Sequence, residues 1–117
     1  MEQQIVNLDY INAIGQNNDE FLLKMINTFL KECPLVISEL EEAVLNENWE
    51  ASSKLAHRFV TSVRFMGMAD IALKLKELEN NTKQGINLED SINLFIPIKQ
   101  ACIQAIEELE TQKRLIL

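Results

Sequence analysis

Apolar residues recur every three or four positions along most of this 117-residue chain, and few helix-breaking residues interrupt them. The sequence contains only 3 Gly and 2 Pro, and runs of β-branched residues are rare. A helical period with so few breaks favours amphipathic helices and argues against a sheet. We therefore expect an all-α protein, and a chain of this length can bury one core without disulfides.

Two helices are predicted in the first part of the chain. Residues 8 to 14 should form a short helix that caps the domain, with Gly15 as its C-terminal cap. Asn17 and Glu20 have the spacing of a capping box, and the apolar period then continues to about residue 46. The second helix should therefore be long.

Three more helices should follow after short polar connections. Asn48 can cap a helix from Trp49 to Met66, with Gly67 as its terminator, and the next helix should span residues 69 to 83. The final helix is indicated by apolar residues at helical spacing: Ile92, Phe95, Ile96, Cys102, Ile103, Ile106 and Leu109. Short connections imply antiparallel neighbours. The simplest architecture is an antiparallel four-helix bundle with a short N-terminal capping helix, formed by residues 1 to 117 as a single domain.

Both prolines fall within predicted helices. Proline removes a backbone donor and crowds the preceding turn, so we expect Pro34 to kink the second helix between Leu30 and Pro34 rather than to end it. Pro97 should either kink the last helix or occupy an early position in it, and the sequence leaves both readings open.

Charge and composition exclude several classes of function. A net charge of −7 and a pI near 4.7 argue against broad electrostatic binding to nucleic acid. The N-terminus lacks the pattern of a leader peptide, and no run of about 18 apolar residues occurs, so we expect a cytoplasmic protein that does not contact membranes. We also expect it to be a monomer. Cys33 and Cys102 lie on apolar stripes without C-x-x-C spacing, which favours buried thiols in a reducing compartment.

The chain contains one histidine, His57, in the third predicted helix. On a helical wheel it falls outside the apolar stripe that contains Phe59 and Val63, so its ring should face solvent. One His without a Glu-x-x-His pair cannot form the usual metal site of a helical bundle, and no metal is expected. His57 is therefore the candidate for chemistry.

Basic residues surround the histidine in the sequence. Lys54 and Arg58 are close to it, Arg64 lies seven residues further on and so on the same flank of the helix, and Thr61 flanks that line. Residues 51 to 76 carry five basic side chains and one acidic side chain, a net charge of +4 in a chain of −7. This contrast indicates a positive patch suited to an anionic group or an acidic partner.

The residues around the histidine resemble the pattern of the histidine phosphotransfer (HPt) domains of bacterial multistep phosphorelays. That family has an Ala-His pair and a Gly ten residues after the His, which Ala56, His57 and Gly67 match. The family's Lys and Gly at the third and fourth residues after the His are replaced by Val60 and Thr61. Further similar segments lie between residues 8 and 80: Leu8, Asp9 and Tyr10; Asp19, Glu20 and Phe21; Phe29 and Leu30; Pro34; Asn48 and Trp49.

The resemblance implies a four-helix bundle that carries a phosphoryl group rather than an enzyme. His57 would accept this group from the receiver-domain aspartate of a hybrid sensor histidine kinase or a response regulator, and would pass it to another receiver. Residues expected to contact the phosphoryl group or the partner are Arg64, Arg58, Thr61 and Lys54. The chain would need no cofactor of its own, because Mg²⁺ would be held by the acidic cluster of the partner receiver.

Two other functions stay open at the level of sequence. With Val60 and Thr61 in place of the family's Lys and Gly, the bundle could bind or sequester a receiver or kinase without being phosphorylated. A plain structural bundle would instead have His57 blocked by its neighbours and no affinity for receivers. Phe65 lies away from the centre of the apolar stripe, and if exposed it would offer a receiver an apolar contact.

Overall fold

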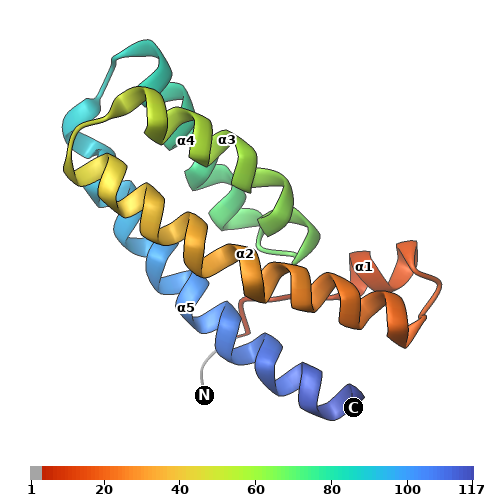
Figure 1. Cartoon of the computed structure of the whole chain (residues 1–117). Coiled ribbons are helices and arrows are strands. Elements are labelled where there is room, and N and C mark those ends of the chain that lie inside the picture. The colour runs from red at the N-terminus through yellow and green to blue at the C-terminus, as the bar shows by residue number, and fades with distance from the viewer. Residues whose placement is uncertain (1–3) are drawn as a thin grey trace.

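The computed structural model describes residues 4–117, and this range is entirely helical apart from its connections (Figure 1). In chain order the elements are α1 (Asp9–Ile14), α2 (Asp19–Leu45), α3 (Trp49–Phe65), α4 (Ala69–Gln84), the short 3-10 helix η1 (Leu88–Asp90) and α5 (Ser91–Ile116). None of the helices in residues 4–117 has both the length and the hydropathy to cross a bilayer. The predicted all-α class is confirmed.

The four long helices pack side by side as an antiparallel bundle (Figure 1). α3 and α5 each pack on both α2 and α4, so every long helix has two neighbours. Three residues connect α2 to α3 and another three connect α3 to α4, which suits antiparallel pairs. α1 lies beside the start of α2 at one end of the bundle. The predicted bundle with a short N-terminal helix is confirmed.

The buried faces of the long helices form one apolar core. Its largest fully buried side chains include Ile26, Leu40, Phe59, Val63, Leu75, Leu78, Phe95, Ile98 and Leu109. The rings of Phe29 and Phe59 are stacked with their centroids 5.9 Å apart, which joins α2 to α3. α3, the helix that carries the histidine, is therefore anchored along its whole inner face.

Both cysteines lie in this core. Cys33 on α2 and Cys102 on α5 are free thiols that are fully buried, as predicted. A hydrogen bond with Cys33, together with burial, raises the pKa of the Cys102 thiol far above its ordinary value. A thiol held protonated in this way is a poor nucleophile and a poor metal ligand.

In the connection from α1 to α2, the predicted C-cap of α1 is confirmed and the predicted N-cap of α2 was wrong by one residue. Asn18 caps α2 by accepting the backbone N–H of Phe21, whereas Asn17 has φ of 60° and cannot take the extended conformation of a cap residue. Gly15 is the C-cap of α1, as predicted, but its φ is −84°, so it does not take the left-handed conformation. A glycine is needed there for space instead, because a Cβ would overlap the ring of Phe21.

Both prolines lie inside continuous helices. α2 runs through Pro34 without a break, as predicted, and the kink there stays a prediction. Pro97 lies beyond the first turn of α5, which begins at Ser91, so it is not one of the early positions of that helix.

The predicted apolar stripe of α5 is only partly buried. The predicted last helix is confirmed, and Phe95 and Cys102 lie in the core, but Ile92, Ile96 and Ile103 are 36%, 47% and 51% exposed. Among the long helices, α5 packs mainly on α2 and α4, and its buried line includes small side chains that let these helices approach: Ser91, Ala101 and Ala105. The large side chains on the adjacent line are left in solvent.

α3 ends in a Schellman turn at Gly67. The backbone N–H of Gly67 donates to the carbonyl of Arg64 at 2.9 Å, and that of Met68 donates to the carbonyl of Val63 at 3.0 Å. Gly67 has φ of 72°, the left-handed conformation that this motif requires. The predicted role of Gly67 as terminator is confirmed.

The N-terminal strap, which we define as residues 4–8, crosses this turn. The backbone N–H of Asn7 donates to the carbonyl of Met66 at 2.9 Å. Gly67 lies so close beneath the strap that a Cβ on it would overlap the backbone carbonyl oxygen of Asn7. The strap therefore joins α1 to the end of α3.

Gly67→Ala should lower the free energy of unfolding by about 1–3 kcal/mol, because the left-handed conformation is strained for alanine and the strap must also move. Gly85→Ala is a matched control, since Gly85 has φ of 69° but a Cβ on it would meet no atom within 4 Å. Gly85→Ala should lower the free energy of unfolding only through the strained backbone conformation, by about 1 kcal/mol. Urea denaturation measures both values, and equal losses would contradict a contact between the strap and the turn.

Candidate functional site

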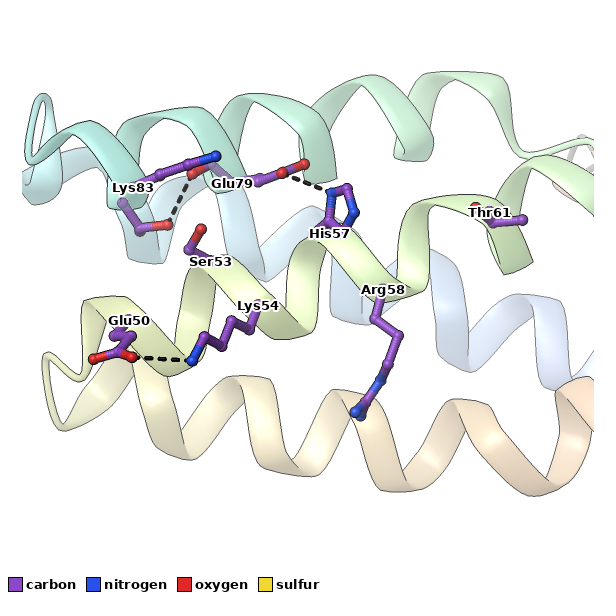
Figure 2. Close-up of a pocket in the computed structure, with 9 residues that line it drawn as sticks. Glu50, Ser53, Lys54, His57, Arg58, Thr61, Glu79 and Lys83 are labelled. Atoms are coloured by element: carbon purple, nitrogen blue, oxygen red, sulfur yellow. Dashed lines mark hydrogen bonds and ion pairs between the residues drawn. The ribbon is translucent and has the colours of Figure 1, made fainter.

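α3 presents His57 on its solvent side. Ala56, Phe59 and Val60 are buried, whereas the side chain of His57 is 75% exposed. In Figure 2 the side chain of Thr61 lies a turn further along α3 and does not cover the ring. The imidazole is therefore neither packed inside the bundle nor blocked by its neighbours, and it projects from an anchored helix.

A glutamate on α4 fixes the orientation of this ring. Nδ1 of His57 lies 2.8 Å from Oε2 of Glu79, whose side chain is only 13% exposed (Figure 2). An ionised carboxylate can only accept a hydrogen bond, so the proton of this bond belongs to Nδ1. The lone pair of the neutral ring is then on Nε2. Thr82, on the next turn of α4, bonds back to the carbonyls of Leu78 and Glu79 and occupies the adjoining wall.

His57 lies in an open groove between α3 and α4 with a volume of about 860 Å³ (Figure 2). We call it the His57 groove. The residues that line it are Glu50, Ser53, Lys54, His57, Arg58, Thr61, Glu79, Thr82 and Lys83. Three of the predicted contact residues, Lys54, Arg58 and Thr61, thus share one groove with the histidine.

The basic side chains around the groove are directed differently. Lys54 pairs with Glu50 at 3.0 Å, on the same helix, and the side chain of Arg58 extends toward α2 (Figure 2). Lys83 runs along α4 toward Glu79 (Figure 2). Three basic and two acidic side chains line the groove, a net charge of +1 with the histidine neutral. The positive patch expected from residues 51 to 76 is therefore much weaker here than the sequence suggests.

Arg64 does not line the His57 groove. It lines a second cavity of about 370 Å³ together with Tyr10, Thr61 and Phe65, which we call the Tyr10 groove. Phe65 is half-buried, and its ring lies beside that of Tyr10 with centroids 5.6 Å apart. Thr61 lines both grooves, so the two are adjacent on the surface of α3.

Val60 occupies the position where the family pattern has a lysine. It is 5% exposed and belongs to the core, so this position of α3 supplies no cation to the groove. Thr61, at the position of the family's glycine, is exposed beside the histidine. Lys83, on α4, is the basic side chain that the structure adds to the lining of the His57 groove.

Glu79 and Lys83 were not among the residues singled out from the sequence. A signal for Glu79 exists in the connection between α3 and α4. His57 and Glu79 each lie eleven residues from Met68, in the turn between the helices. Residues at equal distances from a tight turn face each other in an antiparallel pair, because both helices rise by the same amount per residue.

Most of the chain matches a known protein family. The sequence model of the Hpt domain matches residues 24–112, about three quarters of the chain. The chain belongs to the Hpt domain family. Hpt domains are phosphotransfer carriers of phosphorelays rather than classical enzymes, and they interact with receiver domains. The match includes His57 and Glu79 but not α1, and no curated protein or solved structure gives a significant match.

Proposed function

We propose that His57 is the phosphoryl-accepting residue of this Hpt domain. It takes the group from the aspartyl phosphate of a receiver domain, in a hybrid sensor histidine kinase or a response regulator, and gives it to the aspartate of another receiver. One observation carries the proposal: the exposed ring is held through Nδ1 by Glu79, which leaves Nε2 as the nucleophile.

The phosphoryl transfer to His57 needs no general base. The lone pair of Nε2 attacks phosphorus, an N–P bond forms, and the P–O bond to the donor aspartate breaks to release a carboxylate. Nδ1 keeps its proton throughout, so the ring becomes cationic as the new bond forms. The carboxylate of Glu79, 2.8 Å from Nδ1, lies where it stabilises that charge.

The charges on the phosphoryl oxygens need partners from both proteins. Lys83 borders the groove from α4, and the residues predicted to contact the phosphoryl group or the partner, namely Lys54, Arg58, Thr61 and Arg64, lie on α3. A Mg²⁺ ion in the acidic cluster of the receiver would neutralise the remaining charge. A cytoplasmic location and a monomeric state are parts of the same proposal.

Glu79→Ala should slow phosphoryl acceptance about 3- to 10-fold, because a charge-assisted hydrogen bond that fixes the tautomer of His57 is lost. Glu79→Gln keeps a neutral acceptor and should lie between this variant and the wild type. Rapid-quench labelling measures the rates, and ¹⁵N NMR of the imidazole reports the tautomer. Glu77→Ala, an exposed glutamate on the same helix, is the control that should change neither. An unchanged tautomer in Glu79→Ala would contradict the role of Glu79.

A phosphorylation-independent binding module is the second candidate. It is favoured by the buried Val60 and the exposed Thr61, which replace the family's lysine and glycine, so that α3 supplies no cation there and carries an added side chain one turn from His57. Incubation with a phosphorylated receiver separates the two functions. A carrier should acquire a label that is labile in acid and stable in alkali, whereas a binding module should bind the receiver and acquire none.

A further inference from the structure

The N-terminal strap is fastened to α5 by a carboxylate. Glu108 accepts the backbone N–H of Ile5 at 3.0 Å from each of its oxygens, and that of Val6 at 2.9 Å. The side-chain amide of Gln104 donates to the same carboxylate at 2.8 Å and so holds it from within α5. Val6 is buried at this crossing. The strap is thus held at two points, by Glu108 on α5 and by the end of α3.

α1 depends on this strap for its position. It has six residues, no side-chain bond at its N-cap, and Ile11 as its buried residue. A helix this short is not stable alone in water. Since the strap enters α1 directly, Glu108 and the turn at Gly67 set where α1 starts. The ring contact between Tyr10 and Phe65 then places α1 against the C-terminal half of α3.

Two large apolar side chains of α1 are left in solvent. Tyr10 is 57% exposed and Ile14 is 48% exposed, and they lie one helical turn apart on the same face. With the half-buried Phe65 they form what we call the α1 patch. The Tyr10 groove lies between this patch and Thr61, which also lines the His57 groove, so the patch is continuous with the transfer site.

A typical protein interface centred on His57 is wide enough to reach the α1 patch. A standard interface covers about 800 Å² of each protein, a disc of about 16 Å radius. Phe65 lies eight residues after His57 on α3, a rise of about 12 Å. Toward the other end of the groove the side chains are charged, including Glu50 and Lys54, whereas the centre of an interface favours aromatic and apolar groups. An interface of this size centred on Nε2 therefore extends as far as Phe65, the α3 member of the α1 patch.

We propose that Glu108 is a positioning residue for the receiver domain, because it holds the strap that places Tyr10 and Ile14 beside Phe65 as the apolar part of the docking surface. The proposal rests on phosphotransfer at His57. It assigns a function in partner binding to α1, which lies outside the residues matched by the family, and to a carboxylate on α5 that has no contact with the His57 groove.

The docking surface is tested with two matched double variants and a receiver domain that labels the wild type. Tyr10→Ala with Ile14→Ala should weaken binding to that receiver about tenfold or more, as expected for loss of apolar anchors. Ile96→Ala with Ile103→Ala removes side chains of similar exposure from α5 and should leave the affinity unchanged. Titration calorimetry measures both. Equal affinities of the two double variants would overturn the proposal.

The positioning role is tested with Glu108→Gln against Glu107→Gln. The first keeps the side-chain length and one acceptor oxygen, and the second changes the neighbouring exposed glutamate. Glu108→Gln should weaken receiver binding about 3- to 10-fold, the loss expected for a charged hydrogen-bond acceptor. It should also speed amide exchange at Ile5 and Val6. Faster exchange with unchanged affinity would overturn the role of Glu108.

A small phosphoramidate donor distinguishes a failure of docking at the α1 patch from a failure of phosphorylation at His57. It needs no docking surface, so it should label His57 equally in the wild type, in the Tyr10 and Ile14 double variant and in Glu108→Gln. If the wild type takes no label from this donor or from a receiver, the proposed function fails, and the affinities still decide the docking surface. If the Tyr10 and Ile14 variant loses labelling by the small donor, its defect lies at His57 and the docking proposal fails.

Discussion

His57→Gln should abolish labelling by a phosphorylated receiver, down to the background of the assay. Glutamine has similar length, is tolerated on a helix and can still donate its amide N–H to Glu79, so the bundle should stay folded. Its amide nitrogen has no available lone pair, and no N–P bond can form. Because the transfer depends on one atom, Nε2, the expected effect is complete rather than graded. Radiolabel transfer followed by acid and alkali treatment measures it.

The control for His57→Gln is the removal of a cation that does not line the His57 groove. Lys99→Gln removes a partly exposed cation on α5 that is paired with Glu41 outside the His57 groove, and it should leave labelling within about threefold of the wild type. A persistent label in His57→Gln would mean that another side chain accepts the group. If the wild type takes no label and His57→Gln binds the receiver with unchanged affinity, the chain is a binding module.

The sequence predicted the framework of the site well, because the framework depends on local periodicity. The stripe on α3 that contains Phe59 and Val63 is buried, and this burial leaves His57 on the exposed flank. Gly67 ends α3 in the left-handed conformation that few other residues adopt easily. These features follow from one helix and its turn, without knowledge of its neighbours.

What the sequence did not predict depends on contacts between distant segments. Glu79 was missed because its role requires the register between α3 and α4, which hydrophobic periodicity alone does not give. On α5, Phe95 and Ile96 lie on adjacent lines of one broad apolar arc, and only the positions of α2 and α4 decide which line is buried. Glu108 has no local signal at all, since its hydrogen bonds join residues more than a hundred positions apart.

The net charge of residues 51 to 76 differs from that of the His57 groove for a related reason. This stretch contains basic residues of α3 and α4 but not Glu50 and Glu79, which line the same groove. Lys54 is paired with the first of these and His57 with the second. The groove is thus a mixed site in which a carboxylate orients the nucleophile, and the cations lie around it.

Phe59→Ala should have the largest effect on stability, a loss of about 3–5 kcal/mol in the free energy of unfolding. Phe59 is fully buried, stacks on Phe29 and lies two residues after His57. Removing the ring leaves a cavity between α2 and α3 that the anchored backbones can fill only in part. Natural domains have total stabilities of about 5–15 kcal/mol, so the variant should be close to unfolding at room temperature. Urea denaturation followed by circular dichroism measures the loss.

Phe65→Ala is the matched control, because Phe65 is on the same helix but only half-buried, against Tyr10. Phe65→Ala should lower the free energy of unfolding by less than half as much as Phe59→Ala, since fewer apolar contacts are lost and water can fill the space.

Phe59→Ala should still be labelled when it is folded. At a low temperature where this variant is folded, the label per folded molecule should stay close to that of the wild type. The reason is that the ring of His57 and the carboxylate of Glu79 lie on the opposite side of α3 from the cavity. A variant that is fully folded by circular dichroism but takes no label would mean that the core face of α3 controls the geometry of the histidine directly. In that case the bond to Glu79 would not be sufficient to hold the ring.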